Sequence, residues 1–321
     1  MIYALVLGAI TLAATVTAGY PAVPFLRRQK LGKEISEWAP ETHQAKAGTP
    51  TMGGLLIVLA IVAFTLAANF FGRYSIGLPL AAGGCLAVIG VVDDFGSLQG
   101  RRQAALQRRV KLAAFIAVGA GAAIGLYEFL ELQTVNVPYE GRHDLDWLYI
   151  PIAIGVIVLT AGGVAVTDGL DGLAAGTLAI AFAAYGVLAL HQEQTYLGAF
   201  CFTVTGACAG FLWHNAYPAR VFMGDSGALA LGGVLAVVAF MTGQWLVLPL
   251  IGIIFVIEGG SVALQVGYFR LTGGRRIFRK TPVHHHFEEG GWSEVQTTTR
   301  FWVVGVLGAF VGVALALEVY S

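Results

Sequence analysis

Residues 148–190, LYIPIAIGVIVLTAGGVAVTDGLDGLAAGTLAIAFAAYGVLAL, decide the class of fold. The stretch holds two apolar runs, 148–167 and 171–190, joined by a turn that contains Asp168 and Asp171. A run of about 20 apolar residues is as long as a helix that crosses the hydrocarbon core of a bilayer. The stretch therefore predicts two antiparallel membrane-spanning helices with a very short polar connection.

Apolar runs of this kind fill the chain. Of its 321 residues, 57% are hydrophobic and 12% are charged, whereas soluble domains carry about 25% charged residues. We therefore predict an all-α integral membrane protein that forms a single polytopic domain over residues 1–321, with ten transmembrane helices. The ten predicted spans are 2–25, 51–71, 75–95, 109–130, 148–167, 171–190, 196–213, 226–243, 245–269 and 297–317.

The distribution of basic residues predicts the orientation of these spans. If the loop after the first span is cytoplasmic, 17 of the 19 Lys and Arg residues face the cytoplasm, and only Arg73 and Arg142 face outward. Cytoplasmic loops of membrane proteins carry such an excess. We therefore expect both termini outside. The chain has as many acidic as basic residues, which gives no sign of a nucleic-acid partner.

Polar residues that are costly near a membrane gather on the predicted cytoplasmic side. A carboxylate at membrane depth costs roughly 2.5 to 3.5 kcal/mol on insertion scales. Five segments hold these residues: Thr49–Thr51, Asp93-Asp94, Asp168 with Asp171, Asn215 with Asp225, and His284–His286. We expect the carboxylates to converge at that face.

The aspartates allow a structural and a functional interpretation. Asp93 and Asp94 end a predicted helix, where two negative charges oppose the helix dipole, so we expect a cationic partner beside them. Asp168 and Asp171 have i, i+3 spacing and can share a helical face, or cap a helix. Asp225 precedes an apolar run and also fits an ordinary helix cap.

The histidine run and Glu258 are also open to two interpretations. Three consecutive histidines cannot all point one way, so we do not expect a zinc site built from them alone, although one or two can contact an anion. The basic residues before them follow the inside-positive bias or gather phosphates. Glu258 lies mid-span beside two glycines, where a carboxylate is either functional or a buried hydrogen-bonding group.

Together these groups predict phosphate chemistry at the cytoplasmic face. Carboxylate oxygens with few other ligands suit Mg²⁺, which commonly bridges substrate phosphates. The chain has no P-loop motif, and this argues against an ordinary nucleotide hydrolase.

Five stretches carry a resemblance to a known family. They are KAGTPTMGG (46–54), VDDF (92–95), TDGLDGL (167–173), NAYPARVFMGDSG (215–227) and PVHHHFE (282–288). With them the chain resembles the phospho-N-acetylmuramoyl-pentapeptide transferases of peptidoglycan synthesis, which belong to the polyprenyl-phosphate sugar-1-phosphate transferase superfamily. The resemblance runs nearly end to end, and the HHHFE run is typical of this family rather than of its relatives.

The resemblance implies an activity, a cofactor and a location. The activity is Mg²⁺-dependent transfer of phospho-MurNAc-pentapeptide from UDP-MurNAc-pentapeptide to undecaprenyl phosphate, which gives lipid I and UMP. The expected location is the bacterial inner membrane, among membrane lipids, with a homodimer as the expected assembly. The residues leave open whether the lipid phosphate attacks directly or an aspartate attacks first to form a covalent intermediate.

The resemblance also implies roles for residues at matching positions. Asp225 is the expected Mg²⁺ ligand, and Asp93 and Asp94 are the acidic pair with base or supporting roles. Residues expected to hold uridine are Lys46, Gly169, Leu170, Asp171, Asn215 and Phe222, with Phe222 stacking on the base. Residues expected to line the adjoining substrate site are Thr51, Asp168, Gln265, His284, His285 and His286.

Three positions depart from the family pattern. Ser97 stands where the family has Lys three residues after its Asp-Asp pair, and Gly162 and Ala165 stand where it has Asn before Asp168. Lys111 and Arg109 are basic residues that could supply the missing charge. The departures keep three alternatives open: a related transferase that uses another UDP-sugar, a membrane transporter, and a catalytically silent relative.

Overall fold

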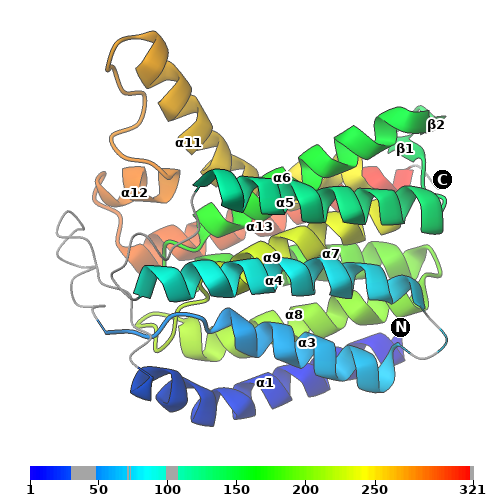
Figure 1. Cartoon of the computed structure of the whole chain (residues 1–321), viewed down its shortest axis with the longest axis horizontal. Helices are drawn as coiled ribbons and strands as arrows, with labels where there is room; N and C mark the ends of the chain where they lie inside the picture. Colours follow the sequence, from blue (N-terminus) through cyan, green and yellow to red (C-terminus); the bar gives the residue numbers. More distant parts are fainter. Residues whose placement is uncertain (30–47, 71, 73, 99–107, 319–321) are drawn as a thin grey trace.

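A computed structural model describes residues 1–29, 48–70, 72, 74–98 and 108–318. The chain forms a bundle of long helices whose axes run roughly side by side (Figure 1). The main helices are α1 (Ile2–Arg28), α3 (Gly54–Ala68), α4 (Gly77–Leu98), α5 (Arg108–Ile124), α6 (Tyr149–Thr167), α7 (Leu173–His191), α8 (Thr195–Asn215), α9 (Asp225–Met241), α11 (Ile253–Leu271) and α13 (Glu294–Leu317). Shorter elements are η1 (Tyr74–Ile76), η2 (Gly125–Phe129), η3 (Asp146–Leu148), η4 (Trp245–Val247), α10 (Leu248–Ile251) and α12 (Val283–Glu288).

The predicted apolar runs become helices in the structure. Within the described ranges, eight helices are long and apolar enough to cross a membrane. The second and eighth predicted spans correspond to the shorter apolar helices α3 and α9, of 15 and 17 residues. A multi-pass membrane protein is therefore confirmed, whereas ten crossings remain a prediction. The N-terminal end of α1 lies at one end of the bundle, together with the short hairpin that follows η2. Helix α12 lies at the opposite end (Figure 1).

The structure is mostly helical, as predicted for an all-α membrane protein, and it differs from the prediction in two details. In a segment predicted as a loop, β1 (Thr134–Val137) and β2 (Gly141–Asp144) form an antiparallel hairpin. Alternating β-branched residues favour the strand, and the turn uses positive φ at Tyr139 and Gly141. The predicted span 245–269 is interrupted at Gly252, since η4 and α10 precede α11. Beyond this break α11 leans out from the bundle (Figure 1).

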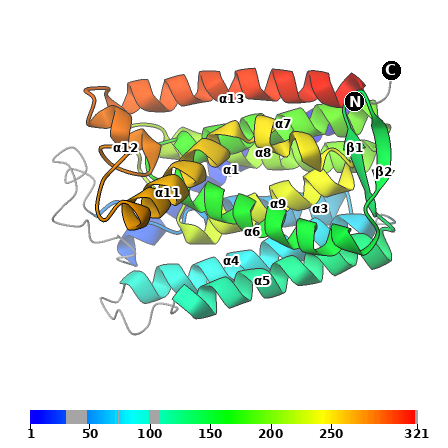
Figure 2. The ribbon, with the colours of Figure 1, turned by 90° about the horizontal axis from the view of Figure 1, so that it is seen from above.

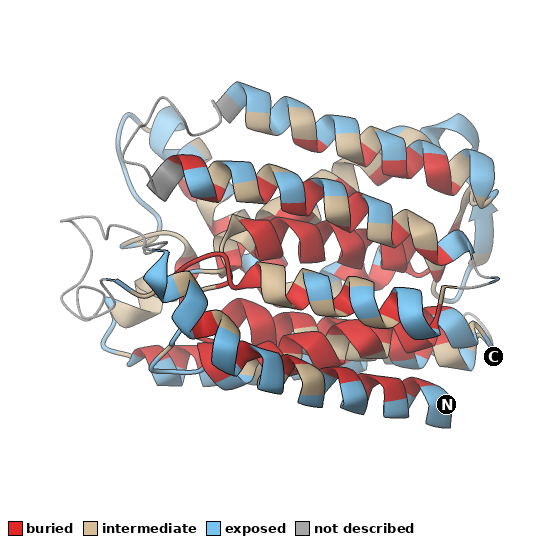
Figure 3. Ribbon diagram, turned by 60° about the horizontal axis from the view of Figure 1, so that its bottom comes forward, coloured by how far each residue is buried: buried red, intermediate tan, exposed pale blue. Residues whose placement is uncertain are grey.

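The core lies between the central helices. In the most apolar 18-residue stretch of each helix, 72% of the residues are buried in α7 and 67% in α8. The corresponding share is 28 to 39% in the six other candidate spans. Figure 3 shows this as buried central helices surrounded by helices whose outer faces are exposed. Figure 2 shows α13 and the α4–α5 pair on opposite sides of the bundle. The exposed outer faces are apolar, as expected for surfaces that contact lipid.

Small residues allow the helices to approach closely. A Cβ atom on Gly206 of α8 would lie 2.1 Å from the carbonyl oxygen of Gly8 in α1. A Cβ on Gly90 of α4 would lie 2.4 Å from the carbonyl oxygen of Asp225, at the start of α9. Close backbone approach at small residues is the usual packing mode of helices in lipid. The Gly90 contact also sets the distance between the two helices that carry the aspartates.

We predict that Gly90→Ala destabilises the protein, whereas Gly84→Ala on the same helix does not. The new methyl group at position 90 would overlap the backbone of Asp225, which cannot rotate away, and overpacking of this kind costs about 1–3 kcal/mol. A Cβ at position 84 would meet nothing within 4 Å. Thermal unfolding in detergent checks this pair. Equal unfolding temperatures for the two variants would show that the α4–α9 contact is not tight.

Candidate active site

Three aspartates and a lysine meet where α4, α5 and α9 come together. The Lys111 Nζ atom lies 2.7 Å from Asp93 Oδ2 and also forms an ion pair with Asp225 Oδ2. The Lys111 side chain is 25% exposed, and those of Asp93 and Asp225 are 16% and 28% exposed. The predicted cationic partner of the Asp-Asp pair is thus confirmed, and it is Lys111. Two carboxylates face one cation at a partly open site.

Asp94 holds the start of α9. Its Oδ1 and Oδ2 atoms accept hydrogen bonds from the backbone N–H groups of Asp225 and Ser226, at 3.2 and 3.1 Å. The first N–H groups of a helix have no partner within the helix, so a carboxylate from a neighbouring helix stabilises them. The Asp94 side chain is buried. Asp94 therefore fixes the position of Asp225 relative to Asp93.

Gly224 joins this group to two other predicted residues. Its N–H donates to Asp168 Oδ2 at 2.9 Å. Gly224 has a φ of +74°, and a Cβ there would lie 2.6 Å from Asp94 Oδ2 and 2.7 Å from Thr51 Oγ1. A side chain at this position would therefore be strained and would collide with both oxygens. Asp168, Thr51 and the three aspartates of the cluster are thus brought together.

Asp171 lies beneath the loop 216–224 and is only 3% exposed. Its Oδ2 atom accepts from the N–H of Ala219 at 2.9 Å, and its own N–H donates to Glu294 Oε1 at 2.8 Å. The position of Glu294 follows from a capping box, in which Ser293 and Gln296 start α13. Through the bond to Ala219, Asp171 fastens the loop that leads to Asp225.

Asn215 and Gln265 also bind backbone groups. Asn215 accepts from the N–H of Gly172 at 3.2 Å and donates to the carbonyl of Val221 at 2.8 Å. Gln265 Oε1 accepts from the N–H groups of Ile277 and Phe278, both at 3.0 Å. The side chains of both residues are buried. They shape the loops around the aspartate cluster.

The remaining predicted contact residues are distributed around these loops. Phe222 is half-buried, and its N–H donates to the carbonyl of Pro50 at 2.8 Å. The Leu170 side chain packs in an apolar cluster with Val283, whereas Gly169 is exposed. Lys46 lies outside the described residues.

The histidine run forms the short helix α12, and each ring has a different partner. His284 Nδ1 lies 2.9 Å from Glu258 Oε2, and both side chains are almost fully buried. His285 Nδ1 lies 2.8 Å from Glu288 Oε2, and His286 Nδ1 accepts from the N–H of Arg279 at 3.1 Å. The rings point in different directions, as the sequence predicts.

The surroundings of His285 favour its neutral form. Burial lowers the pKa of its imidazole below the ordinary value of 6.5, although the hydrogen bond that the ring donates to Glu288 opposes this shift.

His284 reaches the Asp168–Asp171 turn. A Cβ on Gly169 would lie 2.5 Å from His284 Nε2, so only glycine leaves room for the ring. Within the described residues, His284 Nε2 and Glu258 Oε1 are buried atoms without a hydrogen-bond partner. Buried polar atoms are rarely left unpaired. The pair thus presents one imidazole nitrogen to the turn while Glu258 holds the other.

We predict that Glu258→Leu destabilises the protein more than Glu258→Gln. Leu leaves the buried Nδ1 of His284 without a partner, which costs about 1–3 kcal/mol, whereas Gln keeps an oxygen that accepts from it. Thermal unfolding of the two variants and of the wild type measures their relative stabilities. If the Glu258→Leu and Glu258→Gln variants unfold at the same temperature, the Glu258–His284 contact does not orient the imidazole ring of His284.

Comparison with known proteins identifies the class to which this fold and site belong. Residues 76–243, which span α4 to α9, match the family model of glycosyl transferase family 4. Residues 46–58 match signature 1 of the phospho-N-acetylmuramoyl-pentapeptide-transferases. The chain is therefore a membrane-embedded transferase.

Similar proteins narrow this class to one family. The chain is 47% identical to a phospho-N-acetylmuramoyl-pentapeptide-transferase of Chloroflexus aurantiacus, over 99% of this chain and 90% of that protein. It is 41% identical to one of Listeria innocua, over 92% of each chain. The chain belongs to the phospho-N-acetylmuramoyl-pentapeptide-transferase family.

Proposed function

We propose that this protein transfers phospho-MurNAc-pentapeptide from UDP-MurNAc-pentapeptide to undecaprenyl phosphate, forming lipid I and UMP. The pairing of Lys111 with both Asp93 and Asp225 is the observation that carries the proposal. It sets one cation and two carboxylates at a partly exposed position, at the bundle end where the motif-bearing loops meet. We place the protein in the bacterial inner membrane, with this end toward the cytoplasm.

The reaction requires two anions to meet. In the net reaction, an oxygen of the lipid phosphate becomes bonded to the β-phosphorus of the donor, and the bond between that phosphorus and the bridging oxygen breaks, so that UMP leaves with the electron pair. A phosphate monoester has a second pKa near 6 and is mostly a dianion at neutral pH, so it needs little help from a base. The larger barrier is charge repulsion, which cations and fixed dipoles lower.

In the proposed reaction, each side chain of the cluster has a separate role in binding or positioning charged groups. Lys111 offers an ammonium group to the phosphate oxygens, and Asp93 positions it. Asp94 and Asp168 hold the Gly224–Ser226 backbone, which sets the direction of the Asp225 carboxylate. His284, oriented by Glu258, borders the same site at Gly169. Asp171, Asn215 and Gln265 keep the surrounding loops in place, and the uridine contacts implied by the resemblance remain proposals.

The donor set fits Mg²⁺ in particular. Among the described residues, no group of three or more His, Cys, Asp or Glu residues is arranged to hold a metal ion. Mg²⁺ does not require such a group, since it commonly binds one or two carboxylates together with substrate phosphates. Asp225, with Asp93 beside it, would hold the ion. When bound, Mg²⁺ neutralises charge on the phosphates and stabilises the leaving oxygen.

Comparing two UDP-sugar donors tests the proposal against the alternative of a related transferase that uses another UDP-sugar. Purified protein is given undecaprenyl phosphate, Mg²⁺ and either UDP-MurNAc-pentapeptide or UDP-GlcNAc, and the release of UMP is measured. We expect UMP from the first donor only. UMP from UDP-GlcNAc alone would assign the protein to a related sugar-phosphate transferase.

A further inference from the structure

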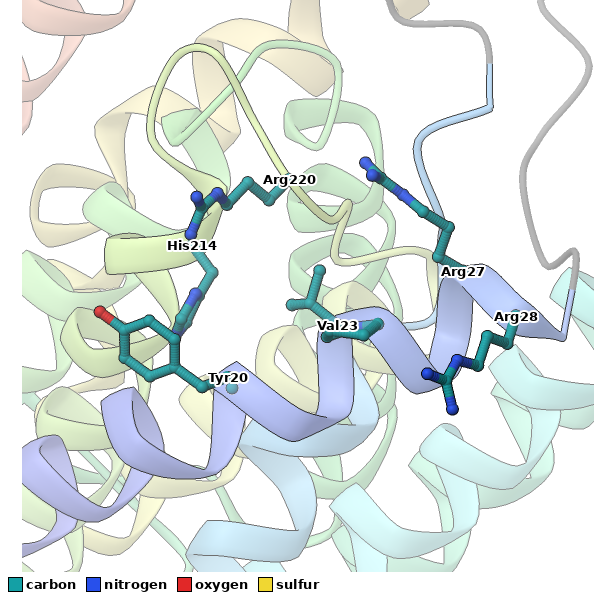
Figure 4. A pocket seen from close by; sticks show the side chains of 8 residues that line it. Tyr20, Val23, Arg27, Arg28, His214 and Arg220 are labelled. Carbon is teal, nitrogen blue, oxygen red and sulfur yellow. The ribbon is translucent and has the colours of Figure 1, made fainter.

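A second site lies between the end of α1 and the loop that follows α8. There the structure has a cavity of about 670 Å³, and Figure 4 shows the side chains that line it. Tyr20, Val23 and Pro24 form an apolar wall, and Arg27, Arg28 and Arg220 supply charge. None of the aspartates of the active-site cluster lines this cavity. It is therefore distinct from the transferase site.

Within the part of the chain that the structure describes, the lining of the cavity is positively charged. The described lining residues include three arginines and no acidic residue. Among the residues that the structure describes, no carboxylate forms a salt bridge with Arg27, Arg28 or Arg220. The arginines come from two segments far apart in the sequence, so it is the fold that places all three around one cavity (Figure 4). Arginine side chains suit phosphate groups, because the guanidinium fork matches phosphate oxygens.

His214 gives the cavity a rigid wall. Its side chain is buried, and its Nε2 donates to the carbonyl oxygen of Val16 at 2.9 Å. The ring lies edge-on to Tyr20 with 5.1 Å between centroids, and a Cβ on Gly19 would lie 2.2 Å from Nε2. These contacts fix the ring in one orientation. The cavity is therefore set by packing between α1 and α8.

Aromatic residues place the cavity at the level of the lipid headgroups. Trp213 and Tyr20 are 66% and 55% exposed, and the Trp213 indole N–H donates to the Tyr20 hydroxyl. Phe25 and Tyr217 are also exposed nearby in the sequence. Exposed Trp and Tyr side chains mark the boundary between hydrocarbon and headgroups. An anion that reaches the cavity at this depth can carry acyl chains, which would lie along the exposed apolar face of α1.

We propose that this cavity binds the phosphate of an anionic phospholipid. The arginines contact the phosphodiester and the acyl chains follow α1, as in other basic pockets between membrane helices. The acceptor of the proposed reaction is not the occupant, because its phosphate must reach the aspartate cluster. Arg220 follows Ala219, whose N–H donates to Asp171, so a bound phospholipid also holds the loop that leads to Asp225.

Lipid titration of delipidated protein in detergent tests the proposal. Binding of phosphatidylglycerol and of zwitterionic phosphatidylcholine is measured by native mass spectrometry. The pocket variant is Arg27→Gln/Arg28→Gln/Arg220→Gln, and the control Arg270→Gln/Arg275→Gln/Arg276→Gln removes the same charge from another exposed region. We expect the pocket variant to bind phosphatidylglycerol on the order of 100-fold more weakly, since each basic residue near the surface contributes about tenfold or less. The control should bind like the wild type.

Further measurements separate the alternatives. An unchanged unfolding temperature of the pocket variant without lipid shows that it is folded. The proposal fails if phosphatidylglycerol binds both variants equally or phosphatidylcholine binds as well as phosphatidylglycerol. It also fails if excess inorganic phosphate displaces the lipid completely, because the occupant would then be free phosphate. Preferential retention of undecaprenyl phosphate would make the cavity an acceptor site and would likewise overturn the proposal.

Discussion

Asp225→Asn is expected to lower the rate of UMP release by about 1000-fold or more. The change is isosteric, yet it removes the carboxylate that pairs with Lys111 and would hold Mg²⁺. A metal ion supplies several kcal/mol of charge stabilisation in the transition state, and each 1.36 kcal/mol corresponds to a factor of ten. The measurement is UMP release by the variant and the wild type at saturating Mg²⁺.

Asp146→Asn is the matched control for this substitution. Asp146 is exposed beside the hairpin, away from the aspartate cluster, and it has a positive φ that Asn tolerates well. The Asp146→Asn variant should release UMP at the wild-type rate. An Asp225→Asn variant that unfolds at the wild-type temperature and retains more than about a tenth of the activity would exclude Asp225 as the principal metal ligand.

Lys111→Met is expected to reduce kcat/KM about 100-fold. Without the ammonium group, two carboxylates face one another and the phosphates lose a cation, and removing one such stabilising group typically costs 10²–10³ in rate. The same change should lower the free energy of unfolding by about 1–2 kcal/mol, because the ion pairs are only partly buried. Steady-state kinetics and thermal unfolding in EDTA measure the two effects.

Arg109→Met separates Lys111 from the general positive charge of α5. Arg109 is exposed, two residues from Lys111, and its loss should change neither kcat/KM nor stability appreciably. Lys111→Arg should recover part of the activity, because the charge is kept while its geometry changes. If Arg109→Met and Lys111→Met reduce kcat/KM equally, the site requires only general positive charge on α5, and not a cation placed between Asp93 and Asp225.

Much of the architecture follows from apolar run length alone. The runs near 148–167 and 171–190 become α6 and α7 almost residue for residue. Run length cannot reveal a break inside an apolar segment, so the interruption at Gly252 is visible only in the structure. The hairpin is missed for a different reason. Its strands are four residues each and pair only with one another, so their apolar pattern is too short to distinguish them from a loop.

The site is predictable by residue type but not by role. Electrostatics predicts a cation beside Asp93 and Asp94, and the sequence offers Lys111 and Arg109, but only the fold distinguishes between them. The function of Asp94 as a partner of the α9 N–H groups depends on a contact between residues more than 130 positions apart. Glu294 carries no motif that marks it, and its contact with Asp171 follows only from the placement of α13.

The departures from the family pattern have a partial structural explanation. Lys111 supplies a cation to the aspartate pair without a lysine at position 97. A Cβ on Gly162 would meet nothing within 4 Å, so a larger side chain could stand at that position. The structure gives no compensating contact for Ala165.

The stoichiometry of the two products tests the proposed transfer reaction most directly. Protein in lipid nanodiscs is incubated with UDP-MurNAc-pentapeptide, undecaprenyl phosphate and Mg²⁺, and both UMP and the lipid product are quantified by mass spectrometry. We expect equal amounts of UMP and undecaprenyl-diphospho-MurNAc-pentapeptide, and neither product in EDTA. Folded protein that forms neither product with Mg²⁺ present would contradict the proposed reaction.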